Sequence, residues 1–422
     1  MKKLFSLLLA CMMLFLTACN QTPPNEITTG SSQNQEQLQD TELKDTIIRN
    51  GNREFIDLPS RILFEYTVPE GEEYTFYYSK ADGKAYVYCF DPLCDHSGKC
   101  LANPRDNKNI FHTEFVSTFF INNRFYVVAD YGQIFSMAFD GSDIRIEYGE
   151  ESYDILNINY YLWSQNYIAY DKYIYIATDL DENEKYNLLR FNTETKEMEN
   201  LTEKTGNFMN PIFFYNGEVY GKGARYQGLE PSWYKADLEM KNMEVIEALP
   251  VSHRFYGSVF FDNAYDNPTD YKNRKTIGIQ AYDMKTDEKK IIANEMLGLE
   301  EEFYTIVATD ENYVYFYPFK KTLVGKRKSH WGDQDVYTTN EGKLYRVKHD
   351  GTECTLIYDN PNFEFSFHYR EAVICGDKIL IRGQEYSVGA DGYVVYHSGG
   401  MMIGTIGPDG KIDKFENIEL VY

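Results

Sequence analysis

The chain has 422 residues, and 65 acidic against 42 basic side chains give it a formal net charge of −23. This sign argues against nucleic acid as a partner, because phosphate binding needs positive charge. Tyr and Phe number 37 and 27, and both are residues that β-strands favour. The composition therefore predicts a β-rich protein that does not bind nucleic acid.

The first segment has the pattern of a secretory signal. Lys2 and Lys3 precede an apolar run over residues 4–16, which is too short for a comfortable membrane span. Leu16-Thr17-Ala18-Cys19 follows directly and resembles the lipobox of bacterial lipoproteins. The resemblance implies a signal peptide over 1–18 and an acylated Cys19 as the first mature residue. Two or more acyl chains would hold the protein in the bilayer, at the extracytoplasmic face of the cell membrane.

Residues 19–50 are predicted to comprise the lipidated Cys19 and a flexible tether that connects it to the folded domain. After Cys19 they are mainly Gln, Thr, Pro, Asn, Ser and Glu. Such a segment has too few large apolar side chains to bury and stays disordered. The folded domain is therefore expected over residues 51–422.

A β-hairpin pattern recurs seven times in this domain. Each copy has an apolar and aromatic run, a tight turn and a second apolar run, and four of the turns contain Asp-Gly. The copies span 76–89, 134–148, 188–201, 233–246, 279–292, 344–358 and 402–415. Seven copies predict a single all-β domain, a β-propeller of about seven four-stranded blades, with six or eight as alternatives.

Two further strands precede each hairpin, so that a blade has strands A to D from the centre outward. Short A–B turns are expected near Asn122-Asn123, Asp171, Asn216-Gly217, Glu311 and Gly376. The A strand of the first blade is not evident. Either residues 46–57 or residues 418–422 could supply it, and the latter would close the ring from the far end.

The links between strands B and C are long at residues 225–232, 266–275, 318–342 and 383–400. Long loops on one face of a repeat fold usually mark the binding face. Two of these links carry candidate ligand-binding side chains. The candidates are Lys326, Arg327, Lys328, His330 and Trp331 in one, and Arg225, Tyr226 and Trp233 at the other.

Each group has a functional and a structural interpretation. The cationic link would grip an anionic polymer such as teichoic acid or an acidic glycan, or it is a solvated loop. Arg225, Tyr226 and Trp233 would form a platform on which a sugar stacks, or the aromatic rings pack within the blade.

Three cysteines and a histidine crowd together after the first hairpin, at Cys89, Cys94, His96 and Cys100. Three thiolates and an imidazole would fill a tetrahedral, structural zinc site. A second interpretation is a disulfide from Cys89 to Cys94 or Cys100, as secreted proteins often contain, and a third is an inert or redox role for the cysteines. The spacing alone does not choose between them.

The segment Phe90-Asp91-Pro92-Leu93-Cys94-Asp95-His96 with its flanking cysteines follows the hairpin over residues 77–84. Together with the signal and the aromatic repeats, it resembles uncharacterised propeller lipoproteins of Gram-positive bacteria. The resemblance implies a surface lipoprotein whose propeller is similar to the Tol-associated periplasmic one. It implies no known activity.

Two functions remain open from the sequence. The first is a membrane-anchored extracellular lipoprotein that acts as a non-catalytic binding propeller, with a protein or an envelope glycan on its loop-rich face. The second is a polysaccharide hydrolase or lyase of propeller fold. The sequence lacks a Gly-x-Ser-x-Gly elbow, a His-Glu-x-x-His motif and a phosphate-cradling glycine loop. Fold alone does not decide between the two.

Overall fold

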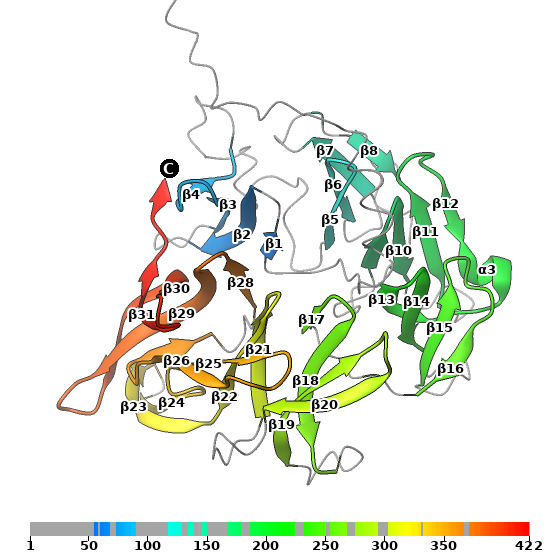
Figure 1. Cartoon of the computed structure of the whole chain (residues 1–422). Coiled ribbons are helices and arrows are strands. Elements are labelled where there is room, and N and C mark those ends of the chain that lie inside the picture. Colours follow the sequence, from blue (N-terminus) through cyan, green and yellow to red (C-terminus); the bar gives the residue numbers. More distant parts are fainter. Residues whose placement is uncertain are drawn as a thin grey trace, which may run out of the picture. The chain divides into compact units, whose positions relative to one another are not determined.

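A computed structural model describes most of the chain from Phe55 onward (Figure 1). The described residues are 55–57, 60–67, 73–89, 117–128, 134–138, 143, 145–149, 167–178, 186–223, 232–247, 249, 254–267, 275–293, 303–330, 332–366 and 371–421. Within them no helix is long and apolar enough to cross a bilayer. Helix α3 (Leu201–Thr205) is a single short turn after a strand.

Seven antiparallel sheets follow one another around the ring, and their order confirms a seven-bladed β-propeller (Figure 1). Blade 1 consists of β1 (Phe55–Asp57), β2 (Arg61–Thr67), β3 (Glu73–Ser79) and β4 (Ala85–Val87). Blade 2 consists of β5 (Ser117–Ile121), β6 (Arg124–Val128), β7 (Ile134–Ala138) and β8 (Arg145–Tyr148). Blade 3 consists of β9 (Tyr167–Tyr170), β10 (Tyr173–Ala177), β11 (Leu188–Asn192) and β12 (Met198–Asn200). Blade 4 consists of β13 (Asn210–Tyr215), β14 (Glu218–Lys222), β15 (Trp233–Asp237) and β16 (Glu244–Ile246). Blade 5 consists of β17 (Arg254–Tyr256), β18 (Val259–Tyr265), β19 (Thr276–Asp283) and β20 (Glu288–Ala293).

Blades 6 and 7 carry additional strands. Blade 6 contains β21 (Phe303–Thr309), β22 (Tyr313–Phe319), β25 (Lys343–Lys348) and β26 (Thr355–Asp359). Blade 7 contains β28 (Ala372–Cys375), β29 (Lys378–Val388), β30 (Val394–Ile406) and β31 (Ile412–Asn417), with β27 (Phe363–Phe365) paired to the far part of β29. A separate hairpin, β23 (Thr322–Ser329) and β24 (Gly332–Thr338), is inserted between β22 and β25.

All seven predicted hairpins are the outer strand pairs of the blades. In blade 6 the turn requires the left-handed conformation of Gly351, with φ at 83°. The three turns without glycine use polar side chains that accept the backbone N–H two residues ahead. These side chains are Asn192, Asp237 and Asp283.

The core is divided into layers between neighbouring blades. One apolar cluster lies at each of the seven junctions, including the junction of blade 7 with blade 1. Successive side chains of a strand point to opposite faces, so a middle strand feeds two clusters. In β22, Val314 and Phe316 pack against blade 5, whereas Tyr315 and Tyr317 pack against blade 7. This two-sided burial explains why the B strands read as unbroken apolar runs.

Both chain segments proposed for the first blade take part in it, at opposite edges. The segment β1 supplies the innermost strand. The terminal strand β32 (Leu420–Val421) instead pairs in parallel with β4 as a fifth, outermost strand. The ring is thus closed by the far end of the chain, but not through the inner strand.

Two of the predicted loops are strands. Residues 318–342 contain the hairpin β23–β24, and residues 383–400 are the extended ends of β29 and β30. The charges of residues 326–328 suggested a solvated loop, but cross-strand pairs near the base stabilise a hairpin, including Thr322 opposite Thr338 and Leu323 opposite Tyr337. These two strand pairs form the largest departure from a plain propeller.

Candidate functional site

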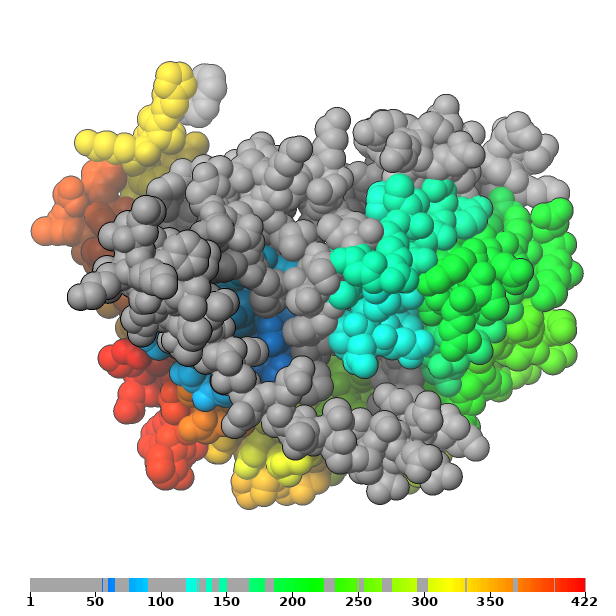
Figure 2. All heavy atoms as spheres, turned by 90° about the horizontal axis from the view of Figure 1, so that it is seen from above, coloured from blue at the N-terminus to red at the C-terminus, as the bar shows by residue number. Residues whose placement is uncertain are grey.

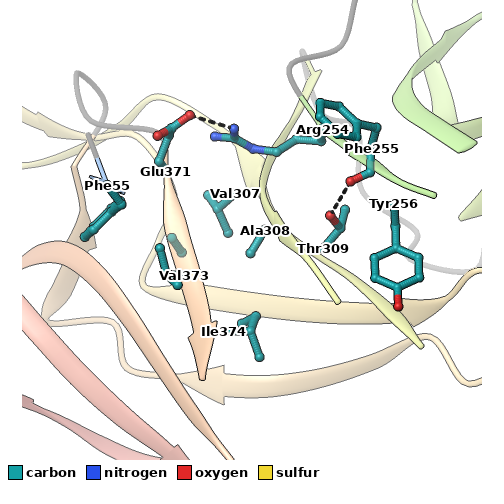
Figure 3. A pocket seen from close by; sticks show the side chains of 11 residues that line it. Phe55, Arg254, Phe255, Tyr256, Val307, Ala308, Thr309, Glu371, Val373 and Ile374 are labelled. Atoms are coloured by element: carbon teal, nitrogen blue, oxygen red, sulfur yellow. Dashed lines mark hydrogen bonds and ion pairs between the residues drawn. The ribbon is translucent and has the colours of Figure 1, made fainter. Parts of the chain in front are cut away.

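A pocket of about 220 Å³ lies among the innermost strands (Figure 3). It is lined by Phe55 of β1, residues 254–256 of β17, residues 307–309 of β21 and residues 371–374 beside and within β28. The Arg254 guanidinium forms an ion pair with Glu371 at 2.9 Å and donates to the carbonyl of Ile306 at 3.0 Å. These contacts join the inner strands of blades 5, 6 and 7.

The described lining of this pocket does not hold the paired carboxylates that glycoside hydrolases commonly use. Glycoside hydrolysis uses two carboxylates on either side of the bond. Here the described lining contains one carboxylate, Glu371, and it is engaged by Arg254. The hydroxyl of Thr309 donates to the carbonyl of Phe255 at 3.0 Å, so it is occupied as well (Figure 3).

A second candidate site is the pair of hairpins β23–β24 and the extended β29–β30, which we call the paired hairpins (residues 322–338 and 383–399). The Lys326 N–H donates to the Gly392 carbonyl at 3.0 Å, and Lys326 forms a parallel bridge with Tyr393. Atoms of the two hairpins project together from one edge of the domain, in yellow and orange (Figure 2).

A small apolar cluster fixes one hairpin on the other. Val336 and Val324 of β23–β24 pack with Tyr386 and Val394 of β29–β30. Gly325 makes this approach feasible, because a Cβ there would lie 2.8 Å from both the Gly392 carbonyl oxygen and a Val394 methyl. The paired hairpins therefore form a packed unit.

Polar contacts complete the junction. The Tyr393 hydroxyl donates to Asp333 at 2.6 Å, and this hydrogen bond raises the pKa of Tyr393 and keeps it a donor. The Lys328 ammonium lies over the Tyr393 ring, 5.3 Å from its centroid. At the base, Glu364 accepts from the Thr339 N–H and the Gln384 amide, both at 3.2 Å.

The surface of the paired hairpins carries exposed apolar side chains, and β23 carries three exposed cations. Among the described residues, nine large hydrophobic side chains are exposed and five of them lie here. They are Leu323, Tyr337, Val388, Val395 and Tyr396. Residues 320–338 contain five basic and two acidic side chains, a net charge of +3 in a chain of −23. Exposed apolar side chains gathered on one projection indicate a contact surface.

The predicted ligand-binding residues divide into three groups. Lys326, Arg327 and Lys328 are exposed on β23, and His330 is exposed in the turn that follows. Trp233 is only 5% exposed and packs against Phe213 in blade 4, with Lys222 over its ring, which is the packing interpretation. Arg225, Tyr226 and Trp331 lie outside the described residues.

The predicted zinc site and lipidation site lie mainly outside the described part of the chain. Cys89 is described, half-buried at the end of blade 1, whereas Cys19, Cys94, His96 and Cys100 are not. The described residues alone contain no group of three or more metal-ligating side chains. The zinc site and the disulfide therefore both stay predictions.

No protein-family model matches the sequence. No curated protein matches it either. Solved structures with a similar chain path include an oligogalacturonate lyase of Vibrio parahaemolyticus, with 11% identity and a TM-score of 0.46 over 86% of this chain and 92% of the lyase. TolB of Acinetobacter baumannii has 9% identity and a TM-score of 0.29 over 94% and 88%. A post-proline cleaving enzyme of Rickettsia typhi has 10% identity and a TM-score of 0.35 over 70% and 52%.

These neighbours include enzymes and TolB, so they do not select an activity for this chain. Their likeness is too distant to carry an argument about any site. The class of protein is therefore defined by its own sheets and surface: a seven-bladed β-propeller with paired hairpins projecting from blades 6 and 7.

Proposed function

We propose that this chain is a non-catalytic binding propeller, held by acylated Cys19 at the extracytoplasmic face of the cell membrane. Residues 1–18 would be the signal peptide, and residues 19–50 the tether that separates the domain from the bilayer. The lipobox pattern at residues 16–19 supports the anchor. A protein or an envelope glycan would be the ligand.

The observation that carries the binding role is the clustering of exposed apolar and cationic side chains on the paired hairpins. A soluble domain gains no stability from such exposure, whereas contact with a partner would remove it from water. In the pocket lined by β17, β21 and residues 371–374, the one described carboxylate, Glu371, forms an ion pair with Arg254. The hydrolase or lyase alternative has no comparable support.

Cofractionation with isolated cell envelopes tests the binding role. The experiment is done in detergent, which dissolves the bilayer and so removes the contribution of the lipid anchor. We expect the envelopes to retain the variant with Leu323→Ser and Tyr337→Ser much less than the wild type. The variant Val245→Ser is the control, because Val245 is 64% exposed on β16, away from the paired hairpins. Equal retention of all three proteins would contradict a binding role for the paired hairpins.

The anchor has a separate test. Cys19→Ala should abolish labelling by fatty acid and move the protein out of the membrane fraction, because no thiol remains for acylation. Continued labelling of the Cys19→Ala chain would show that the lipid is attached elsewhere or that the lipobox interpretation is wrong.

A further inference from the structure

The outward face of β23–β24 is defined by alternation along the strands. Val336 and Thr338 are buried, whereas Asp333, Asp335 and Tyr337 between them are exposed. The residues that pair with the exposed positions share their face. These partners are Lys328, Lys326 and Leu323. The outward face thus combines an apolar pair, Leu323 with Tyr337, and two cross-strand pairs of opposite charge, Lys326 with Asp335 and Lys328 with Asp333. The charges of these two pairs balance, whereas residues 320–338 as a whole carry a net charge of +3.

The cations on β23 are exposed, and two of them also have contacts within the hairpins: Lys328 lies over the Tyr393 ring, and Arg327 donates to the Gln334 amide oxygen. Lys326, Arg327 and Lys328 are exposed, and no carboxylate among the described residues lies within ion-pair distance of them. Elsewhere in the described chain, lysines on the blades are commonly paired, for example Lys235 with Glu244 at 2.7 Å. A net charge of +3 over residues 320–338 in an acidic protein favours an anionic ligand by charge complementarity.

The aromatic rings of the paired hairpins are poorly placed for sugar stacking. The Lys321 ammonium covers the Tyr337 ring at 4.4 Å, and Lys328 covers the Tyr393 ring. Tyr386 and Tyr396 meet edge to face, with centroids 6.3 Å apart. A glycan needs a free ring face for stacking, and these rings offer few.

The exposed aliphatic side chains point to a polypeptide instead. Leu323 is 56% exposed and Val395 is 51% exposed. Leucine and valine lower the free energy of binding by contact with other apolar groups, at about 25 cal/mol per Å² of area removed from water. Proteins supply such groups, whereas the hydroxyl-rich surface of a polysaccharide does not.

We propose that the outward face of β23–β24 binds an acidic segment of a partner protein that also carries aliphatic side chains. Acidic side chains of the segment lie against Lys326 and Lys328, and its apolar side chains cover Leu323 and Tyr337. The packing of β23–β24 on β29–β30 holds these groups in place before binding, which limits the entropy lost on association. This inference rests on the proposed binding function and names its ligand class.

The test uses the full-length chain in detergent and a random peptide library displayed on phage. Selected peptides are synthesised, and their affinity is measured for the wild type, Leu323→Ser with Tyr337→Ser, and Lys326→Glu with Lys328→Glu. Lys241→Glu with Lys411→Glu is the matched charge control, since both lysines are exposed on other turns. Polygalacturonate and polyglutamate are titrated in parallel.

We expect selected peptides to be rich in Asp and Glu with interspersed Leu, Ile or Val. Both hairpin variants should bind them roughly tenfold or more weakly, as for contact residues at the centre of an interface, whereas the charge control should bind as the wild type does. Peptides that lack acidic residues, or that bind the hairpin variants equally well, would overturn the inference.

The remaining outcomes separate this inference from the proposed function. If polygalacturonate binds in a manner that depends on Lys326 and Lys328 and no peptide does, the peptide class is wrong but the binding surface stands. Binding of polyglutamate alone, without any dependence on Leu323 or Tyr337, would also overturn the inference. If no ligand depends on the paired hairpins and envelope retention is equal, both proposals fail.

Discussion

Glu364 lies at the base of the paired hairpins, where β24, β27 and β29 meet. It accepts hydrogen bonds from Thr339 and Gln384, yet its burial outweighs them and raises the pKa of its carboxyl above the usual 4.5. A buried carboxylate without a cation is costly to ionise. The folded protein therefore binds the proton of Glu364 more tightly than the unfolded chain does, and this difference makes stability depend on pH.

Glu364→Gln is predicted to raise stability at neutral pH. For a group whose pKa is raised on folding, the stabilisation is complete below the unfolded value of 4.5 and is lost as pH rises through the folded value. Glutamine keeps an acceptor for Thr339 but does not ionise. Urea unfolding should show the variant to be more stable than the wild type at pH 8, with a gap that closes toward pH 4.5. A gap that is the same at both pH values would contradict this account.

At the scale of elements, the sequence predicted the outer hairpins well because their turns carry local signals. A tight turn is favoured locally at Asp350-Gly351, where glycine adopts the left-handed conformation, and at Asp283, whose side chain accepts the Lys285 N–H. These signals do not depend on contacts with the rest of the chain. The inner strand β17 has a weak sequence signal because it contains only three residues, although Gly257 follows it with φ at 56° and marks the turn.

The paired hairpins were missed for a different reason. The run Lys326-Arg327-Lys328 has the composition of a solvated loop, and the residues opposite it, Asp333, Gln334 and Asp335, are polar as well. The run Val336-Tyr337-Thr338, which consists of residues that strands favour, could have indicated the strand. The packing of Val336 on Tyr386 and Val394 could not have been predicted, because it joins segments about fifty residues apart and no local pattern encodes such a contact.

Gly325→Ala is predicted to separate the two hairpins. The new Cβ would lie 2.8 Å from the backbone oxygen of Gly392, so the contact between Lys326 N–H and that oxygen must open. Hydrogen exchange at the Lys326 amide should become faster, while exchange in the blades stays unchanged. Gly407→Ala is the control, because its Cβ would meet only the side chain of Asp409 closer than 3.4 Å. Equal exchange at Lys326 in the two variants would contradict the close packing.

At the scale of the whole molecule, ring closure depends on the last described strand. The cluster between blades 7 and 1 includes Ile418, which is 6% exposed, and Leu420 packs against it. The Ala85 N–H donates to the Glu419 carbonyl at 3.1 Å, and β32 pairs with β4. A propeller without this closure would expose the edge of its first blade to water.

A chain that ends after Asn417 is predicted to be less stable by roughly 2–4 kcal/mol, because full burial of Ile418 contributes about 1.5–3 kcal/mol and the partly buried Leu420 contributes less. Thermal unfolding of the full and shortened chains measures the difference. Glu419→Gln is the control, since it removes only the exposed ion pair with Lys84, worth about 0–1 kcal/mol. A shortened chain as stable as the Glu419→Gln variant would contradict this role of β32.

The central claim, that the paired hairpins are the surface at which this propeller meets an acidic protein, is tested most directly by photocrosslinking in intact cells. A photoreactive side chain is placed at Tyr337, and for comparison at Val245. We predict a crosslinked protein of one defined mass from position 337 only, acidic in composition, which disappears when Lys326→Glu and Lys328→Glu are added. The same products from both positions, or a product that persists after the charge reversal, would contradict the claim.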